Sequence, residues 1–190
     1  MILDIHPLLS ILYSVLIVNG FYNLSKFISK TKYLIFLENH AVGGRLISFF
    51  LIINFFSIIL YSFFLLFGIN EIYLKILIIL LILIGFYKPD NIQKLFKKYI
   101  LIDNKSKLLL FIIILGYALI SLLPITDPDS LDYHLTFPYL SLINKSFFIQ
   151  NEWFTSQLTG AGEALIIFGL SINAYKLSSI LQFVALLSII

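Results

Sequence analysis

Long apolar runs, separated by shorter polar segments, set the pattern of this chain. Four of these runs approach the roughly 20 apolar residues that a helix needs to cross the hydrocarbon core of a bilayer. They cover about 7–24, 46–67, 72–87 and 108–123. The pattern therefore predicts an all-α fold: a polytopic transmembrane helix bundle, whose four-helix region comprises residues 1–124.

Two further regions follow the four spans. Residues 125–160 are predicted to form an extracytoplasmic acidic loop, with an amphipathic interfacial helix at 128–137 that Pro138 interrupts. Residues 161–190 are predicted to hold a short apolar helix and the start of a further transmembrane span. The last apolar run continues to Ile190 without a flanking charge, so we expect the chain to be the N-terminal part of a longer protein.

The composition supports a membrane protein. Hydrophobic residues make up 60% of the chain and charged residues 12%, and the mean hydropathy is +1.01. A soluble domain of this size does not bury so much Ile, Leu and Phe, so the lipid bilayer is the expected partner. The net charge of +3 comes from lysines clustered between the apolar runs and does not suggest a nucleic-acid partner. The lack of cysteine excludes disulfides and thiolate zinc sites.

The lysines also predict an orientation. Segments 25–45 and 88–107 are basic and are expected to face the cytoplasm. The N-terminus, the turn at 68–71 and segment 125–160 then face outward, and they carry most of the acids. The abundance of Ile, Phe, Tyr, Asn and Lys is typical of an AT-rich bacterial genome, so the expected location is the bacterial inner membrane.

The segment Thr126-Asp-Pro-Asp-Ser-Leu-Asp-Tyr-His134 gathers three carboxylates and an imidazole in a chain with few charges. On a helix, Asp129, Asp132 and Tyr133 share one face, while His134 lies off that face, nearer the leucines. One interpretation is structural: Asp127 caps the helix and the other acids form a solvated polar face. The other is chemical: Asp129 and Asp132 act as a general base, bind Mg²⁺ or Mn²⁺, or hold sugar hydroxyls.

Other candidates lie further along the chain. Glu163 precedes a short apolar helix, where it can cap the helix start or face a cavity as an interior acid, with Gly160 and Gly162 as a hinge. Trp153 and Phe154 fit interfacial anchors better than platforms that stack on a sugar.

The order of features in this region resembles the first outer loop of GT-C membrane glycosyltransferases. The features are an apolar span, the motif Asp-x-Asp-x-x-Asp-Tyr-His, an aromatic-rich segment, and a Glu before a short apolar helix. That group includes protein O-mannosyltransferases and lipid A aminoarabinose transferases. The resemblance covers about 108–190 and implies transfer of a sugar from a polyprenyl-phosphate donor to an acceptor on the outer face. It implies that Asp129 and Asp132 are catalytic or ligate a metal, and that Tyr133, His134 and Glu163 bind substrate.

Two departures from the family and one alternative remain. The acidic loop follows the first span in the best-known members, whereas three spans precede the matching one here, and most of the family's later helices are absent from this chain. The alternative function is a non-enzymatic polytopic membrane protein, either a transporter subunit or a scaffold. No acid or base lies in the middle of the four spans, where transport coupling is expected, and a scaffold needs no acidic cluster.

Overall fold

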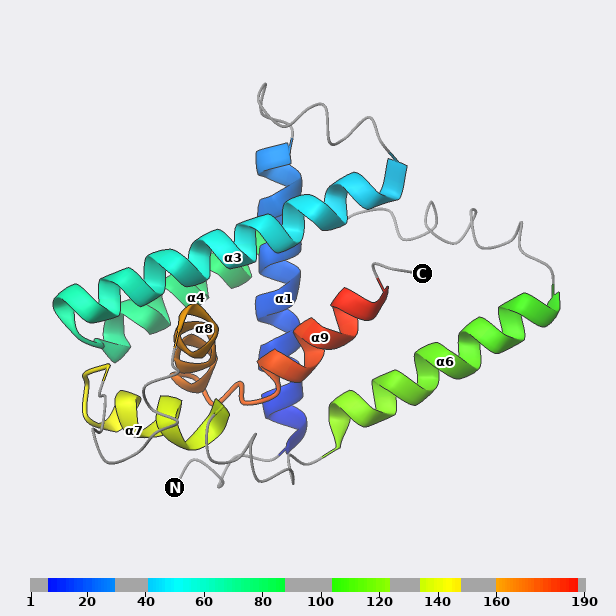
Figure 1. The fold of residues 1–190 in the computed structure, drawn as a ribbon. Helices are drawn as coiled ribbons and strands as arrows, with labels where there is room; N and C mark the ends of the chain where they lie inside the picture. The colour runs from blue at the N-terminus through cyan, green and yellow to red at the C-terminus, as the bar shows by residue number, and fades with distance from the viewer. Residues whose placement is uncertain (1–6, 30–40, 88–103, 124–133, 148–159, 188–190) are drawn as a thin grey trace.

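The computed structural model describes residues 7–29, 41–87, 104–123, 134–147 and 160–187 (Figure 1). Within these ranges the chain forms helices, turns and bends, and no strand, so the predicted all-α fold is confirmed. In chain order the helices are α1 (Pro7–Ser29), α3 (Ala41–Phe67), α4 (Glu71–Phe86), α6 (Asn104–Leu122), α7 (Phe137–Ile143), α8 (Ala161–Leu170) and α9 (Leu177–Leu187).

Three of the described helices are long and apolar enough to cross a membrane. Their candidate spans are Pro7–Ile28, Ile47–Phe67 and Lys105–Leu122. The apolar run at 72–87 forms α4, whose 16 residues make it shorter than the other three. Many Leu, Ile and Phe side chains of α3, α4 and α6 are exposed, which a bilayer tolerates because lipid tails are as apolar as these side chains. The protein is therefore a helical membrane protein.

Helices α1 and α4 cross at close range because glycines line their contact. A side-chain carbon on Gly20 would meet the backbone of Leu81, and one on Gly85 would lie 2.9 Å from the Asn19 amide nitrogen. The amides of Asn19 and Asn23 each donate a hydrogen bond of 2.9 Å to the carbonyl oxygen of Gly85. Small residues and hydrogen bonds from amide side chains are usual means by which helices associate in a membrane.

Helix α8 is packed inside the bundle, below α3 and above α7 in the view of Figure 1. Phe56 of α3 links it to α1, because the Phe56 ring lies 5.1 Å from both Phe21 of α1 and Phe168 of α8, edge to face in each case. From Glu163 to Leu170 the helix is buried except at Ile166, which is partly buried. This burial fixes the position of the residues at the start of α8.

The described contacts join segments that the lysine pattern assigns to one side of the membrane. The Ile69 N–H, in the turn between α3 and α4, donates to the carbonyl oxygen of Lys145 at 2.8 Å. Lys176 contacts the first turns of α1 and the end of α6, through a backbone hydrogen bond of 3.4 Å to the Ser10 hydroxyl and a side-chain hydrogen bond to the Leu123 carbonyl. These contacts agree with the predicted topology. Which side faces outward stays a prediction.

The expected interruption at Pro138 is wrong. Pro138 lies in the first turn of α7 and is buried. A proline fits there because the N–H it lacks has no partner within the first helical turn, and its fixed φ suits a helix. Residues 134–136 form a π-helical turn just before α7, and the rest of the predicted interfacial helix, 128–133, lies outside the described residues.

Candidate functional site

The start of α8 places a carboxylate inside the protein. Glu163 is the third residue of the helix, and its Oε2 accepts a hydrogen bond of 2.7 Å from the Gly160 N–H. This is the glutamate half of a capping box, and the positive end of the helix dipole favours the negative charge. Only 6% of the surface of Glu163 is exposed. One carboxylate oxygen of Glu163 therefore caps the helix, and the other is available to contact a second group.

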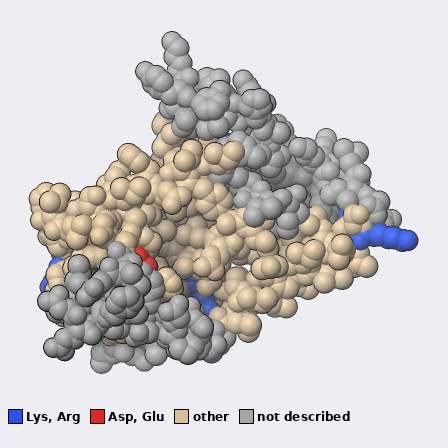
Figure 2. All heavy atoms as spheres, viewed as in Figure 1, with Lys and Arg blue, Asp and Glu red and all other residues tan. Residues whose placement is uncertain are grey.

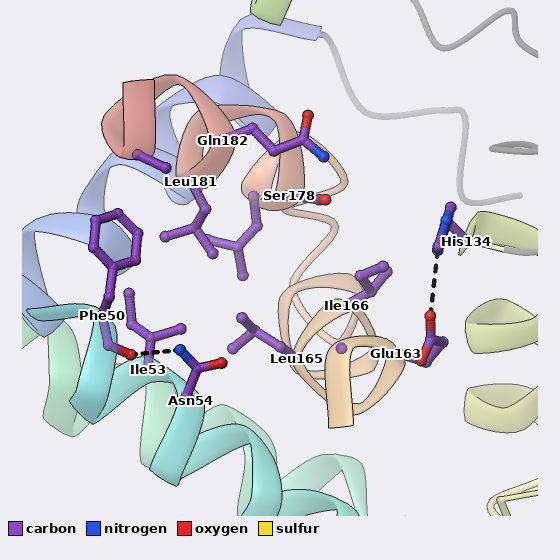
Figure 3. Close-up of a pocket in the computed structure, with 13 residues that line it drawn as sticks. Phe50, Ile53, Asn54, His134, Glu163, Leu165, Ile166, Ser178, Leu181 and Gln182 are labelled. Carbon is purple, nitrogen blue, oxygen red and sulfur yellow. Dashed lines mark hydrogen bonds and ion pairs between the residues drawn. The ribbon is translucent and has the colours of Figure 1, made fainter. Parts of the chain in front are cut away.

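The second oxygen faces a histidine. Glu163 Oε1 lies 3.3 Å from Nδ1 of His134, which comes from the π-helical turn before α7 (Figure 3). The histidine side chain is 45% exposed, whereas that of Glu163 is 8% exposed. When Nδ1 carries the proton of a neutral imidazole, it donates to the carboxylate, and Nε2 then carries the lone pair. The pair can thus orient an imidazole for hydrogen bonding or for proton transfer.

A cavity of about 330 Å³ adjoins this pair, between α3, α8 and α9 (Figure 3). Its walls are mainly apolar, and His134 and Glu163 contribute to them together with Asn54, Ser178 and Gln182. The apolar lining residues include Phe50, Ile53, Leu165, Ile166, Leu177 and Leu181. Figure 2 shows a small acidic area on a described surface that is otherwise mainly uncharged. A buried acid next to an apolar cavity is the arrangement expected of a binding site rather than of a solvated surface.

A buried lysine holds the start of α9 in place. Lys176, in the turn between α8 and α9 and outside the three span helices, is only 2% exposed. Its ammonium donates to the Leu123 carbonyl at the end of α6 and lies 5.8 Å from the centre of the Tyr175 ring. Loss of hydration lowers the pKa of the Lys176 ammonium from its ordinary value of 10.5. This lysine links α6 to α9, the helix that forms one wall of the cavity.

Of the residues singled out from the sequence, the structure brings His134 and Glu163 together. Asp129, Asp132 and Tyr133 lie outside the described residues, as do Trp153 and Phe154. Within the described ranges, no three His, Asp or Glu side chains are grouped so that they would hold a metal ion, and the expected Mg²⁺ or Mn²⁺ site stays a prediction for Asp129 and Asp132.

Sequence reasoning missed three residues of this region. Lys176 lies in a break between two apolar runs, a position that does not reveal its burial. Ser178 and Gln182 lie four residues apart, which places both on one face of α9. That spacing of polar residues within an apolar run was the signal that could have identified them.

Comparison with known proteins identifies a family. A family profile described as the DUF1420 N-terminal domain matches residues 84–190, more than half of the chain. The matched region includes α6 to α9, the acidic segment, His134 and Glu163. No curated protein and no solved structure matches the chain.

Proposed function

The chain belongs to the DUF1420 family, and we propose that it is the N-terminal part of an integral membrane glycosyltransferase. The proposed reaction transfers a sugar from a polyprenyl-phosphate donor to an acceptor on the outer face of a bacterial inner membrane, with the N-terminus of the chain outside. The observation that carries the proposal is the His134–Glu163 pair beside an apolar cavity, because His134 is the last residue of the acidic segment.

The membrane setting suits such a donor. A polyprenyl chain stays in the lipid, so the enzyme must bring its reactive groups to the level of the lipid headgroups. Among the described residues, Lys176 joins the start of α1 to the end of α6, and the turn at 68–70 bonds to the turn at 144–146, which follows α7. The resemblance to GT-C glycosyltransferases, carried by the acidic motif and by the Glu before α8, points to the same reaction.

We assign the proton transfer to the acidic segment. The acceptor hydroxyl attacks the anomeric carbon of the sugar, and a new C–O bond forms as the bond from that carbon to the phosphate oxygen breaks. Asp129 or Asp132 takes the hydroxyl proton, and the electron pair leaves with the polyprenyl phosphate. The same two carboxylates suit Mg²⁺ or Mn²⁺, since hard cations prefer oxygen ligands. Tyr133, His134 and Glu163 then contact the substrate.

The test compares three aspartates in the natural protein in its own membranes. Asp129→Asn and Asp132→Asn should each lower sugar transfer, because loss of a general base typically costs roughly 10²–10⁴-fold in rate. Asp127→Asn is the matched control and should cost little, since Asn caps a helix about as well as Asp. The assay follows radiolabelled sugar from the polyprenyl-linked pool of the source membranes into acceptor, at equal protein levels.

The contrary result is equally clear. If all three variants transfer sugar at the wild-type rate, the acids form a solvated polar face and do not act in catalysis. The catalytic site would then lie elsewhere in the protein. If membranes that lack this protein transfer the sugar as fast as those that contain it, a non-enzymatic role, as a scaffold or transporter subunit, replaces the enzyme.

A further inference from the structure

Two cavities meet along α9. The larger, of about 330 Å³, and a smaller one of about 140 Å³ share four lining residues: His134, Ile166, Ser178 and Gln182. The cavities therefore lie side by side, with one face of α9 and the exposed histidine between them. A combined space of this size is in the range of small-molecule sites, which span about 300–1,000 Å³.

The walls of the two cavities differ in chemistry. The larger cavity is lined mainly by apolar side chains from α3, α8 and α9. The smaller cavity adds Tyr175 and Ser179 to the shared Ser178 and Gln182, so hydroxyl and amide groups form a much larger part of its wall. Within the described part of the chain, none of these four side chains makes a hydrogen bond to protein. They offer several donors and acceptors to a ligand.

The charges around the cavities select against an anion. No lysine or arginine lines either cavity among the described residues, and the charged side chain that does is Glu163. A phosphate placed here would meet a carboxylate without a compensating cation, which is unfavourable in a site with apolar walls. An uncharged group rich in hydroxyls has no such cost and can bond to Ser, Tyr and Gln.

We infer that the paired cavities bind an amphiphile with an uncharged, hydroxyl-bearing head. The head lies in the smaller cavity against Tyr175, Ser178 and Gln182, and the apolar part of the molecule lies in the larger cavity. This inference rests on the proposed function and deepens it, because it makes the acceptor a lipid-like alcohol rather than a protein. The hydroxyl then sits near the His134–Glu163 pair, and the phosphate of the donor is bound elsewhere.

The test uses n-octyl glucoside that carries a diazirine in its alkyl chain, with the whole protein in lipid nanodiscs. After irradiation, peptide mass spectrometry should locate the label on α3, α8 and α9 near the larger cavity. Excess n-octyl glucoside should compete, and n-octyl phosphate, with the same chain length, should not. Ser178→Ala and Gln182→Leu should each reduce labelling roughly 2- to 10-fold, as the loss of a single hydrogen bond typically does.

Ser62→Ala is the matched control, because this exposed hydroxyl on α3 bonds to the Ile58 carbonyl and lines neither cavity. Its labelling should equal that of the wild type. Gln182→Lys provides a second test, which looks for a gain of binding and not for reduced labelling. A cation at this position should let n-octyl phosphate compete with the probe. A normal size-exclusion profile shows that each variant is folded.

Two results would overturn the inference. Competition by n-octyl phosphate in the wild type would make the cavities an anion site. Labelling that spreads over exposed α6 and is unchanged in Ser178→Ala and Gln182→Leu would show that the probe only partitions into lipid. The assay needs no sugar transfer, so the two proposals can fail separately. Asp129→Asn and Asp132→Asn variants that transfer sugar at the wild-type rate would exclude these acids from catalysis but leave the binding site.

Discussion

Glu163 serves the fold and the candidate site with different oxygens. Oε2 accepts the Gly160 N–H at the start of α8, and Oε1 faces His134. Both alternatives that the sequence leaves open, a helix cap and an interior acid beside a cavity, therefore describe the same side chain. The pairing with His134 was beyond prediction, because 29 residues separate the two and only the packing of α7 against α8 brings them together.

The two roles of Glu163 separate by substitution. Glutamine also completes a capping box, so Glu163→Gln should unfold at nearly the same temperature as the wild type. It removes the charge that faces His134, and sugar transfer should fall about 10- to 100-fold, as for loss of a hydrogen bond to a charged group. Glu163→Ala also loses the cap, which typically stabilises by about 1 kcal/mol. This variant should therefore lower both the unfolding temperature and the rate of sugar transfer.

Thermal unfolding and sugar transfer, measured on the same preparations, check this prediction. If Glu163→Gln transfers sugar as fast as the wild type, the carboxylate is a helix cap alone.

At the scale of elements, the apolar runs predict which segments become helices, and the details of packing remain hidden. The helices that contain the first two spans are longer than the apolar runs, since α1 continues to Ser29 and α3 begins at Ala41. Hydropathy locates the apolar run, whereas a helix continues for as long as its backbone N–H and C=O groups form hydrogen bonds within the helix. The glycines of α1 and α4 also went unnoticed, because their role depends on which helix faces them.

The contact between α1 and α4 can be tested with two glycines. Gly20→Ala places a carbon against the backbone of Leu81, which cannot move aside like a side chain, and should destabilise the protein by about 1–3 kcal/mol. Gly116→Ala is the control, because nothing lies within 4 Å of the added carbon on α6. Alanine favours a helix over glycine by about 1 kcal/mol, so the control should be neutral or stabilising.

Unfolding followed in a denaturant series, in the same detergent for both variants, measures these changes. Equal effects of the two substitutions would contradict the close approach of α1 to α4.

At the scale of the whole molecule, hydropathy predicts a helical membrane protein and the structure agrees. The described part of the chain assembles α1, α3, α4 and α8 around a shared core, while no residue in the span of α6 is fully buried and this helix packs against α9. Hydropathy cannot distinguish a helix that faces lipid from one that faces protein, because both are apolar. The sites between helices depend on that distinction, which explains why the cavities could not be predicted.

The central claim is that the candidate site lies at the outer surface of the membrane. It is tested most directly with single cysteines in this cysteine-free chain and a thiol reagent that does not cross membranes, applied to intact cells. Asn144→Cys, exposed in the turn after α7, should be labelled from outside, and Gln93→Cys, in the basic segment, should be labelled only after the cells are opened. Labelling of Gln93→Cys in intact cells, with Asn144→Cys protected until lysis, would place the site inside the cell and contradict the account.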